Sequence, residues 1–234
     1  MKSEVDIGAH FVKQSERYQQ VVDGANKELY ENIRAELDRN LNGVILDIGN
    51  GGVFGYDVDK LERVIAVDLA FDENMQDSEK IKYIRDDARV LKTIESNSCD
   101  CVVMQFLVHH IVDENIKLTN DSILASLKEA HRVLKPKGKL IIIEEIVLFF
   151  IEYVEDVLYK MNFRLLILIN KPMIKFYSEK GLRSRLRSAG FALVTIKKID
   201  QGKWVDPFGG LFPGVVKIPA FLYPAKCCAI IAVK

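Results

Sequence analysis

The chain has 234 residues, and its 33 basic and 33 acidic side chains give a formal net charge of zero. This length fits a single domain with a sizeable core. Hydrophobic residues make up 49% of the chain and charged residues 28%, a composition that excludes wholesale disorder. Because the balanced charge creates no overall field that would hold a polyanion, nucleic acid is not expected as a partner.

Four cysteines lie in two close pairs within apolar runs, Cys99 with Cys101 and Cys227 with Cys228. Neither spacing is typical of a disulfide framework or a metal knuckle, so we expect buried, reduced thiols in a cytoplasmic protein, with a zinc site as the alternative. The first residues lack the apolar stretch of a signal peptide. The most apolar region, 146–169, carries five charged side chains, so no membrane span is expected.

Apolar runs alternate with helix-patterned segments along the first half of the chain. Residues 2–41 are expected to be helical, most clearly 25–41. Strands are predicted at 43–48, 63–68, 81–85, 99–104 and 139–144, and a helix at 122–134 that Pro136 and Gly138 would end. Strands that are apolar throughout and separated by helices predict a parallel sheet covered on both faces.

The second half predicts a helical insertion at 146–170, a helix at 178–189 and strands at 192–199 and 227–233. The link between the last two strands, 200–226, holds four prolines and four glycines. It therefore cannot be a crossover helix, and the last two strands are predicted to pair antiparallel.

The predicted fold class is α/β. It comprises a Rossmann-like, seven-stranded, mostly parallel sheet with an antiparallel last strand, helices on both faces, an N-terminal helical cap and a helical insertion after the fifth strand. We expect one domain over residues 1–234. Its parts are a cap (1–42), a core that would bind a cofactor (43–145), an insertion or lid (146–177) and the C-terminal part of the sheet (178–234).

The sharpest motif is a glycine turn after the first predicted strand, Val-Ile-Leu-Asp-Ile-Gly-Asn-Gly-Gly (44–52). Glycines let the backbone approach a ligand closely at the carboxyl end of a sheet. Phe54 stands where the dinucleotide-binding pattern has its third glycine. Asp68 ends the next strand, where an acid can bind ribose hydroxyls. Asp47 suits an ammonium group rather than a pyrophosphate, and Asp87 could accept a hydrogen bond from an adenine amino group. These features together indicate S-adenosylmethionine.

In these motifs the chain resembles the class I S-adenosylmethionine-dependent methyltransferases, in particular small-molecule enzymes of the methyltransferase type 11 kind. The matching segments are LDIGNGG (46–52), VIAVDL (64–69), RDDARVL (85–91), CDCVVMQFLVHHI (99–111), EAHRVLKPKGKLIIIEE (129–145) and LRSAGFALVTI (186–196). Two positions depart from the family pattern. Val53 stands where a further small residue is common, and Lys137 replaces the first glycine of Lys-Pro-Gly-Gly.

The resemblance implies a cofactor site built from an N-terminal helix and the ends of the first four strands. Its residues would be Tyr18, Asp47, Gly49, Asn50, Gly51, Asp68, Leu69, Asp87, Ala88, Gln105 and Phe106. Two of them have a structural alternative, because Asp87 also fits a helix N-cap and Tyr18 an ordinary amphipathic helix.

Candidate catalytic residues follow the fourth and fifth strands. His109 or His110 could act as a general base, and the alternative is a hydrogen-bonded spacer. Glu145, which ends the fifth strand together with Glu144, could take a proton from the acceptor, orient it or cap a helix. No metal site is predicted.

Two late segments are candidate walls of an acceptor pocket, the apolar insertion 146–177 and the aromatic segment 202–224. The alternative for the insertion is ordinary core. The basic cluster of Arg183, Arg185, Arg187, Lys197 and Lys198 is expected to be a solvated face.

The predicted function is methyl transfer from S-adenosylmethionine to an oxygen, nitrogen or carbon nucleophile of a small organic acceptor, in cytoplasmic biosynthesis. The product of the cofactor would be S-adenosylhomocysteine, and the protein would mainly orient the reactants. Three alternatives stay open: a non-catalytic S-adenosylmethionine-binding partner or regulator, an NAD-dependent oxidoreductase, and a methyltransferase of RNA or protein. The acceptor and the oligomeric state have no signature in the sequence.

Overall fold

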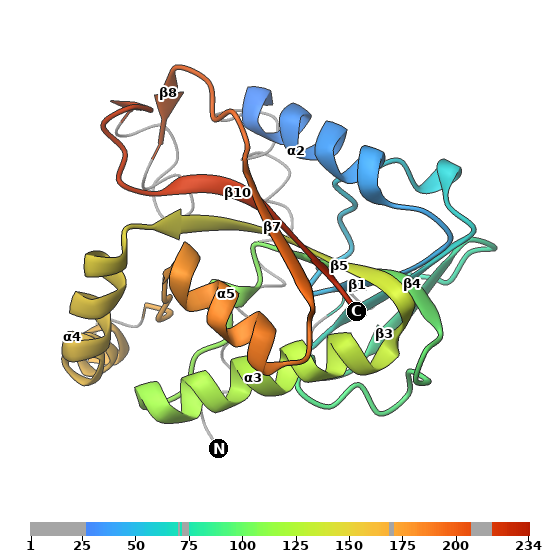
Figure 1. Cartoon of the computed structure of the whole chain (residues 1–234), viewed down its shortest axis with the longest axis horizontal. Coiled ribbons are helices and arrows are strands. Elements are labelled where there is room, and N and C mark those ends of the chain that lie inside the picture. Colours follow the sequence, from blue (N-terminus) through green and yellow to red (C-terminus); the bar gives the residue numbers. More distant parts are fainter. Residues whose placement is uncertain (1–26, 70, 72–74, 169–170, 207–216) are drawn as a thin grey trace.

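The computed structural model describes residues 27–69, 71, 75–168, 171–206 and 217–234. A sheet of eight strands forms its centre (Figure 1). The strands are β1 (Val44–Ile48), β2 (Arg63–Asp68), β3 (Ile81–Arg85), β4 (Cys99–Gln105), β5 (Leu134–Val147), β6 (Tyr177–Ser178), β7 (Leu193–Lys198) and β10 (Lys226–Val233).

Seven of these strands follow the order β3-β2-β1-β4-β5-β10-β7, and the short β6 pairs in parallel with the end of β5. Strands β1 to β5 pair in parallel, whereas β10 is antiparallel to both of its neighbours. The fold class predicted from the sequence is thereby confirmed, including the antiparallel pairing of the last two strands.

Helices cover both faces of the sheet, as Figure 1 shows. The helix α2 (Lys27–Asn40) packs on one face, where Ile33 and Leu37 join a core cluster with Ile45 of β1. The helices α3 (Ile116–Val133) and α5 (Glu179–Ser188) contribute to the cluster on the other face, which contains Leu46. Neighbouring residues of β1 therefore serve opposite cores, which explains why the strand is apolar without alternation.

The junction between α3 and β5 differs from the sequence prediction. The helix ends at Val133 and β5 begins at the next residue, so Pro136 and Gly138 lie inside the strand and do not end the helix. The register between β4 and β5 shifts between Cys99 and Cys101, and such an irregularity accommodates a proline that cannot donate a ladder hydrogen bond. Lys137 has φ +66°, a conformation that glycine would adopt with less strain.

The helix α4 (Phe149–Leu168) follows β5 and is held through polar contacts. The buried carboxylate of Glu152 accepts hydrogen bonds from the backbone N–H of Ser178 at 2.9 Å and from Arg185 Nη1 at 3.0 Å. Within α4 the only buried residues are Glu152 and Tyr159, so the interpretation of this helix as ordinary core is wrong. The prediction of a solvated face is wrong for Arg185, because the guanidinium is largely shielded by this contact.

The link between β7 and β10 contains a two-stranded antiparallel sheet, β8 (Trp204–Val205) with β9 (Ile218–Pro219). Two short 3-10 helices complete the described elements, η1 (Val58–Lys60) and η2 (Val108–His110). Among the helices of the described residues, none has the length and apolar character needed to cross a membrane.

The four cysteines are buried and form no disulfide. Burial is the largest cause of the raised pKa of all four thiols. Within the described ranges no three His, Cys, Asp or Glu side chains are grouped so that they could hold a metal ion.

Replacing Glu152 with alanine is expected to destabilise the fold by about 3–5 kcal/mol, because Arg185 loses its buried partner. Urea denaturation would measure the free energy of unfolding. The matched control is Glu179→Ala, which removes an exposed ion pair with Arg183 and should cost less than about 1 kcal/mol. Equal losses in the two variants would contradict this account of how α4 is held.

Candidate functional site

The turn after β1 has Gly49, Gly51 and Gly52 at positive φ, +74°, +58° and +87°. A Cβ atom placed on Gly49 would lie 2.5 Å from Leu107 Cδ1, whereas one on Gly51 would meet nothing within 4 Å. Gly49 is therefore required by packing as well as by its backbone conformation. Gly51 borders open space, as a backbone that approaches a ligand would.

Asp68 lies against this turn. Its Oδ2 accepts a hydrogen bond from the Gly51 backbone N–H at 2.9 Å, and Gly49 N–H donates to the carbonyl of Val67 at 2.7 Å. The next residue, Leu69, is exposed. The structure thus brings the glycine turn and the acid at the end of β2 together, as the motif spacing predicts.

Asp47 is buried beneath the turn. Its Oδ2 accepts hydrogen bonds from Tyr56 Oη and Asn50 Nδ2, both at 2.8 Å. Burial raises the pKa of Asp47 to about 7, the two hydrogen bonds lower it, and the nearby Asp68 carboxylate raises it further. Because a cation beside the carboxylate favours its ionised form, the site is poised to respond to a positively charged ligand near neutral pH. Tyr56 was not anticipated, since a tyrosine in a loop carries no motif.

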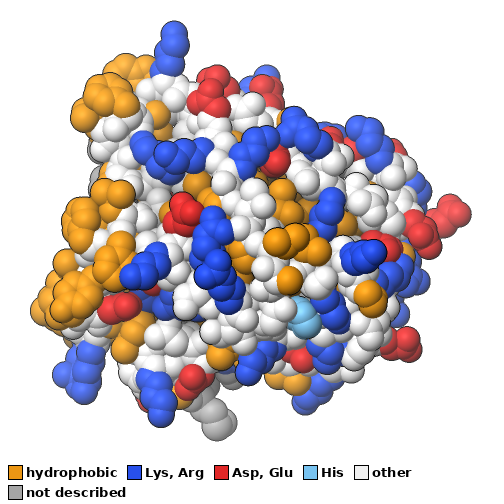
Figure 2. Space-filling model, viewed as in Figure 1, with side chains coloured by type: hydrophobic (Ala, Val, Ile, Leu, Met, Phe, Trp, Pro, Cys, Tyr) orange, Lys and Arg blue, Asp and Glu red, His pale blue; other side chains and the backbone are white. Residues whose placement is uncertain are grey.

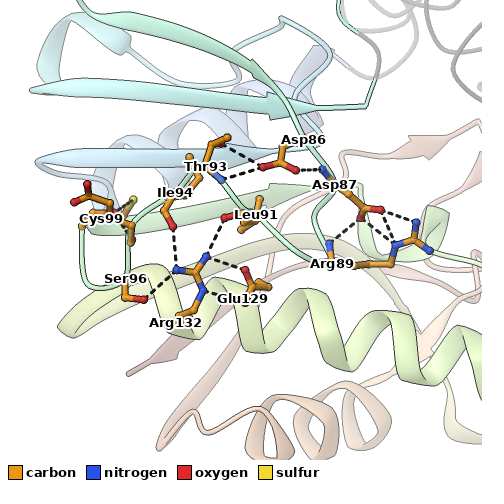
Figure 3. A network of polar contacts seen from close by, with 12 residues as sticks. Asp86, Asp87, Arg89, Leu91, Thr93, Ile94, Ser96, Cys99, Glu129 and Arg132 are labelled. Carbon is orange, nitrogen blue, oxygen red and sulfur yellow. Dashed lines mark hydrogen bonds and ion pairs between the residues drawn. The ribbon is translucent and has the colours of Figure 1, made fainter.

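Asp87 follows β3 at the same edge of the sheet. Its side chain forms hydrogen bonds with a residue two positions later in the chain (Figure 3). Its carboxylate accepts from the backbone N–H of Arg89 at 2.8 Å and from Arg89 Nη2 at 2.6 Å. Burial raises the pKa of Asp87, but the contacts with Arg89 outweigh it and the pKa is lowered overall. The alternative of a helix N-cap is wrong, because no helix directly follows Asp87 and its carboxylate instead stabilises a turn at residues 88–90. The adjacent Ala88 packs partly buried against the core.

The loop that follows Asp87 is braced from α3. Arg132 donates from Nη2 to the carbonyl of Leu91 at 3.0 Å and from Nη1 to that of Ile94 at 2.9 Å, and Glu129 Oε2 accepts from the same guanidinium at 2.8 Å (Figure 3). The loop after β3, which borders the site, is therefore anchored to the core helix α3.

The end of β4 supplies Gln105 and Phe106. A Cβ atom on Gly55 would lie 2.6 Å from Gln105 Oε1, so the Gln105 side chain reaches the loop after the glycine turn. Phe106 has φ +51° and packs edge-to-face on Tyr30 of α2, with ring centroids 6.3 Å apart. The predicted cofactor residue Tyr18 lies outside the described residues.

His109 forms a pair with the buried Glu144. Nδ1 of His109 lies 2.7 Å from Glu144 Oε1, and the His109 backbone N–H donates to Glu144 Oε2 at 3.2 Å. Burial lowers the pKa of His109, but the Glu144 carboxylate outweighs this effect and the pKa is raised overall. The His110 ring lies against that of His109, with centroids 4.0 Å apart. Glu144 was noted with Glu145 at the end of β5, but its pairing with His109 depends on the packing of two distant segments.

Glu145 forms a second pair, with Tyr223 of the aromatic segment. Tyr223 Oη donates to Glu145 Oε2 at 2.9 Å. Burial raises the pKa of Glu145, and the hydrogen bond from Tyr223 lowers it in part. The contact brings Tyr223, near the end of the candidate wall 202–224, to the end of β5.

The strand register aligns these groups along one edge. Ile48 pairs with Met104, and Gln105 pairs with Ile143. The glycine turn, the end of β4 and the two glutamates therefore lie side by side at the carboxyl edge of the parallel strands. The result is an edge rich in carboxylates, which suits a cationic ligand, beside a histidine and a carboxyl that can exchange protons.

Comparison with known proteins agrees with this fold. Residues 46–142 match the family model described as a methyltransferase domain. No curated protein matches the sequence. Among solved structures, the Burkholderia thailandensis 1,6-didemethyltoxoflavin-N1-methyltransferase, with bound 1,6-didemethyltoxoflavin and S-adenosylhomocysteine, is 16% identical. The alignment covers 98% of this chain and 88% of that one, with a TM-score of 0.63.

Two further structures are similar in fold. A Thermotoga maritima S-adenosylmethionine-dependent methyltransferase is 20% identical over 100% of both chains, with a TM-score of 0.57. A Haloferax volcanii protein described as a methyltransferase, in complex with the Trm112 methyltransferase activator, is 15% identical. That alignment covers 95% of this chain and 96% of the other, with a TM-score of 0.65.

Replacing Glu144 with glutamine is expected to lower the pKa of His109, because burial is then opposed only by the weaker effect of the Glu145 carboxylate. Titration of the histidine ring signals by NMR would measure the change. His131, on the distant α3, serves as an internal reference whose pKa should not move. An unchanged pKa of His109 in this variant would contradict the pairing.

Proposed function

We propose that this chain is a class I S-adenosylmethionine-dependent methyltransferase that methylates an oxygen, nitrogen or carbon nucleophile of a small organic acceptor. The match of residues 46–142 to a methyltransferase domain supports the proposal. We place the reaction in cytoplasmic biosynthesis, which the four buried, unbridged thiols support. We also propose a single domain over residues 1–234, with the cap at 1–42, the cofactor-binding core at 43–145, the insertion at 146–177 and the rest of the sheet at 178–234.

The observation that carries the proposal is the edge where the buried Asp47, the glycine turn and the His109–Glu144 pair follow neighbouring strands. In our assignment Asp47, Gly49, Asn50 and Gly51 hold the methionine end of the cofactor. Asp68 and Leu69 bind the ribose, Asp87 and Ala88 the adenine, and Gln105 and Phe106 lie near the sulfonium, with Tyr18 closing the site from the N-terminal segment.

S-adenosylmethionine supplies an already activated methyl group, so the protein has mainly to orient the acceptor and exclude water. His109 is the first candidate for a general base. Because Glu144 Oε1 lies 2.7 Å from Nδ1 and favours the tautomer with its proton on that nitrogen, Nε2 becomes the proton acceptor. Glu145 is the second candidate, since burial raises its pKa. His110, against the ring of His109, would position it.

Cofactor affinity is expected to depend on the ionisation of Asp47. The cationic amino-acid group binds the ionised carboxyl, so below the pKa of about 7 the affinity should fall about tenfold per pH unit. At alkaline pH the ligand's own amino group loses its proton and the affinity should fall again. Calorimetric titration with S-adenosylhomocysteine between about pH 5.5 and about pH 10 would trace both limbs.

The matched variant is Asp47→Asn, which keeps the size of the side chain but removes its titration. It should bind the ligand more weakly than the wild type at neutral pH and show no low-pH limb. A wild-type profile that stays flat through neutral pH would contradict the placement of the ammonium group at Asp47.

The nature of the acceptor can be tested with methyl-labelled S-adenosylmethionine and a cell extract from which macromolecules have been filtered. We expect label in a small product. If His109 is the base, transfer by His109→Gln should be at least about 100-fold slower than transfer by the wild type. Lys128→Gln, on the exposed side of α3, is the control and should transfer at the wild-type rate.

Other outcomes separate the remaining interpretations. Label found only in the retained RNA or protein fraction would overturn the small-acceptor proposal. Tight binding of S-adenosylhomocysteine without transfer to any fraction would indicate a non-catalytic binding partner or regulator.

A further inference from the structure

The helix α4 exposes apolar side chains to solvent, whereas an ordinary surface helix buries them against the core. Its outward side chains are large and apolar: Phe150, Val157 and Met161 are 61%, 65% and 58% exposed. The full exposed set on this helix and the residue before it is Leu148, Phe149, Phe150, Tyr153, Val154, Val157, Leu158, Met161, Leu165, Ile167 and Leu168. Exposed apolar side chains that are contiguous mark an interaction surface.

The acidic residues of α4 face the protein instead. Glu152 contacts Ser178 and Arg185, as described above. Glu155 Oε2 accepts from the Phe176 backbone N–H at 3.1 Å, and Asp156 lies 2.7 Å from the buried Lys175 Nζ. These contacts fix the rotation of the helix about its axis, so its apolar side is held towards the solvent.

The two basic residues of α4, Lys160 and Arg164, are both exposed. At helical spacing Lys160 lies one turn after Asp156, at the border of the outward apolar side chains, and Arg164 lies one turn further on beside the same side chains. The outer face of α4 therefore combines apolar and cationic side chains. This is the composition of a helix that lies in the interface of an anionic membrane.

A second exposed apolar site lies at the same end of β5. Phe221 and Leu222 are exposed and shortly precede β10, whose first residue, Lys226, pairs with Ile146. In Figure 1, α4 and β8 lie along one edge of the molecule. Figure 2 shows apolar side chains gathered along that edge, with Lys and Arg side chains among them.

We propose that the outer face of α4 docks onto an anionic lipid surface, lying along the membrane without crossing it. A second copy of the chain fits this face less well. The three acids of α4 are engaged within their own chain, so the same helix of a second copy would offer Lys160 and Arg164 no free carboxylate as a partner. Docking of this kind is independent of methyl transfer.

The test is sedimentation of the full-length protein with vesicles of phosphatidylcholine, with or without phosphatidylserine. We expect binding to the vesicles that contain phosphatidylserine, weakened by high salt. Lys160→Gln with Arg164→Gln should lower the partition coefficient about 30-fold. Val157→Gln with Met161→Gln, which removes apolar contacts without changing the charge, should also reduce binding.

The matched control is Lys82→Gln with Lys128→Gln, two exposed lysines on β3 and α3, which should bind as the wild type does. Circular dichroism and thermal unfolding would verify that each variant folds. Absence of wild-type binding to the anionic vesicles, or unchanged binding by both α4 variants, would overturn the proposal. So would a dimer in ultracentrifugation that the α4 variants dissociate, or binding that begins only after residues 1–26 are removed.

Discussion

The parallel pairing of β1 with β2 on one side and β4 on the other places every part of the candidate site. Parallel strands end at the same edge of a sheet, so the groups that follow them meet there although they are far apart in the chain. Asp68 reaches the Gly51 backbone through this pairing, and the register of β4 with β5 brings Glu144 beside His109. The all-buried β1 makes the register strict, because a slip of one residue would exchange its two core faces.

The same dense packing controls the chemistry of the site. A carboxyl group that is removed from water resists ionisation, which is why the pKa of Asp47 is raised to about 7. For His109 the effect of burial is reversed by a neighbouring carboxylate. The pKa values of Asp47 and His109 are thus both raised, but for different reasons. Burial has the larger effect at Asp47, whereas at His109 the neighbouring carboxylates together outweigh burial. A site with this property can respond to the charge of a ligand and can exchange a proton with it.

The helix α4 shows how a buried polar network can determine the surface of a protein. The contacts of Glu152 with Ser178 and Arg185 orient the helix, and the apolar side chains are consequently directed outwards. From the sequence, the residues after β5 fit either a core helix or a lid, since a run of apolar residues does not reveal which side faces the protein. Only the location of the partners of the three acids decides between these arrangements.

The sequence by itself determined the strands at the centre of the sheet, the glycine turn and the acid at the end of β2. The strands depend on local patterning, and the motif has a spacing that is set by one strand–turn–strand unit. It also indicated the antiparallel end of the sheet from the prolines and glycines of the last link. The tertiary structure decided which polar groups meet: Tyr56 with Asp47, Glu144 with His109, and Tyr223 with Glu145. It also placed Pro136 within β5 and turned Arg185 inwards. Those outcomes depend on contacts between distant segments in a low-dielectric interior, where a charged or polar side chain requires a partner that local sequence does not specify.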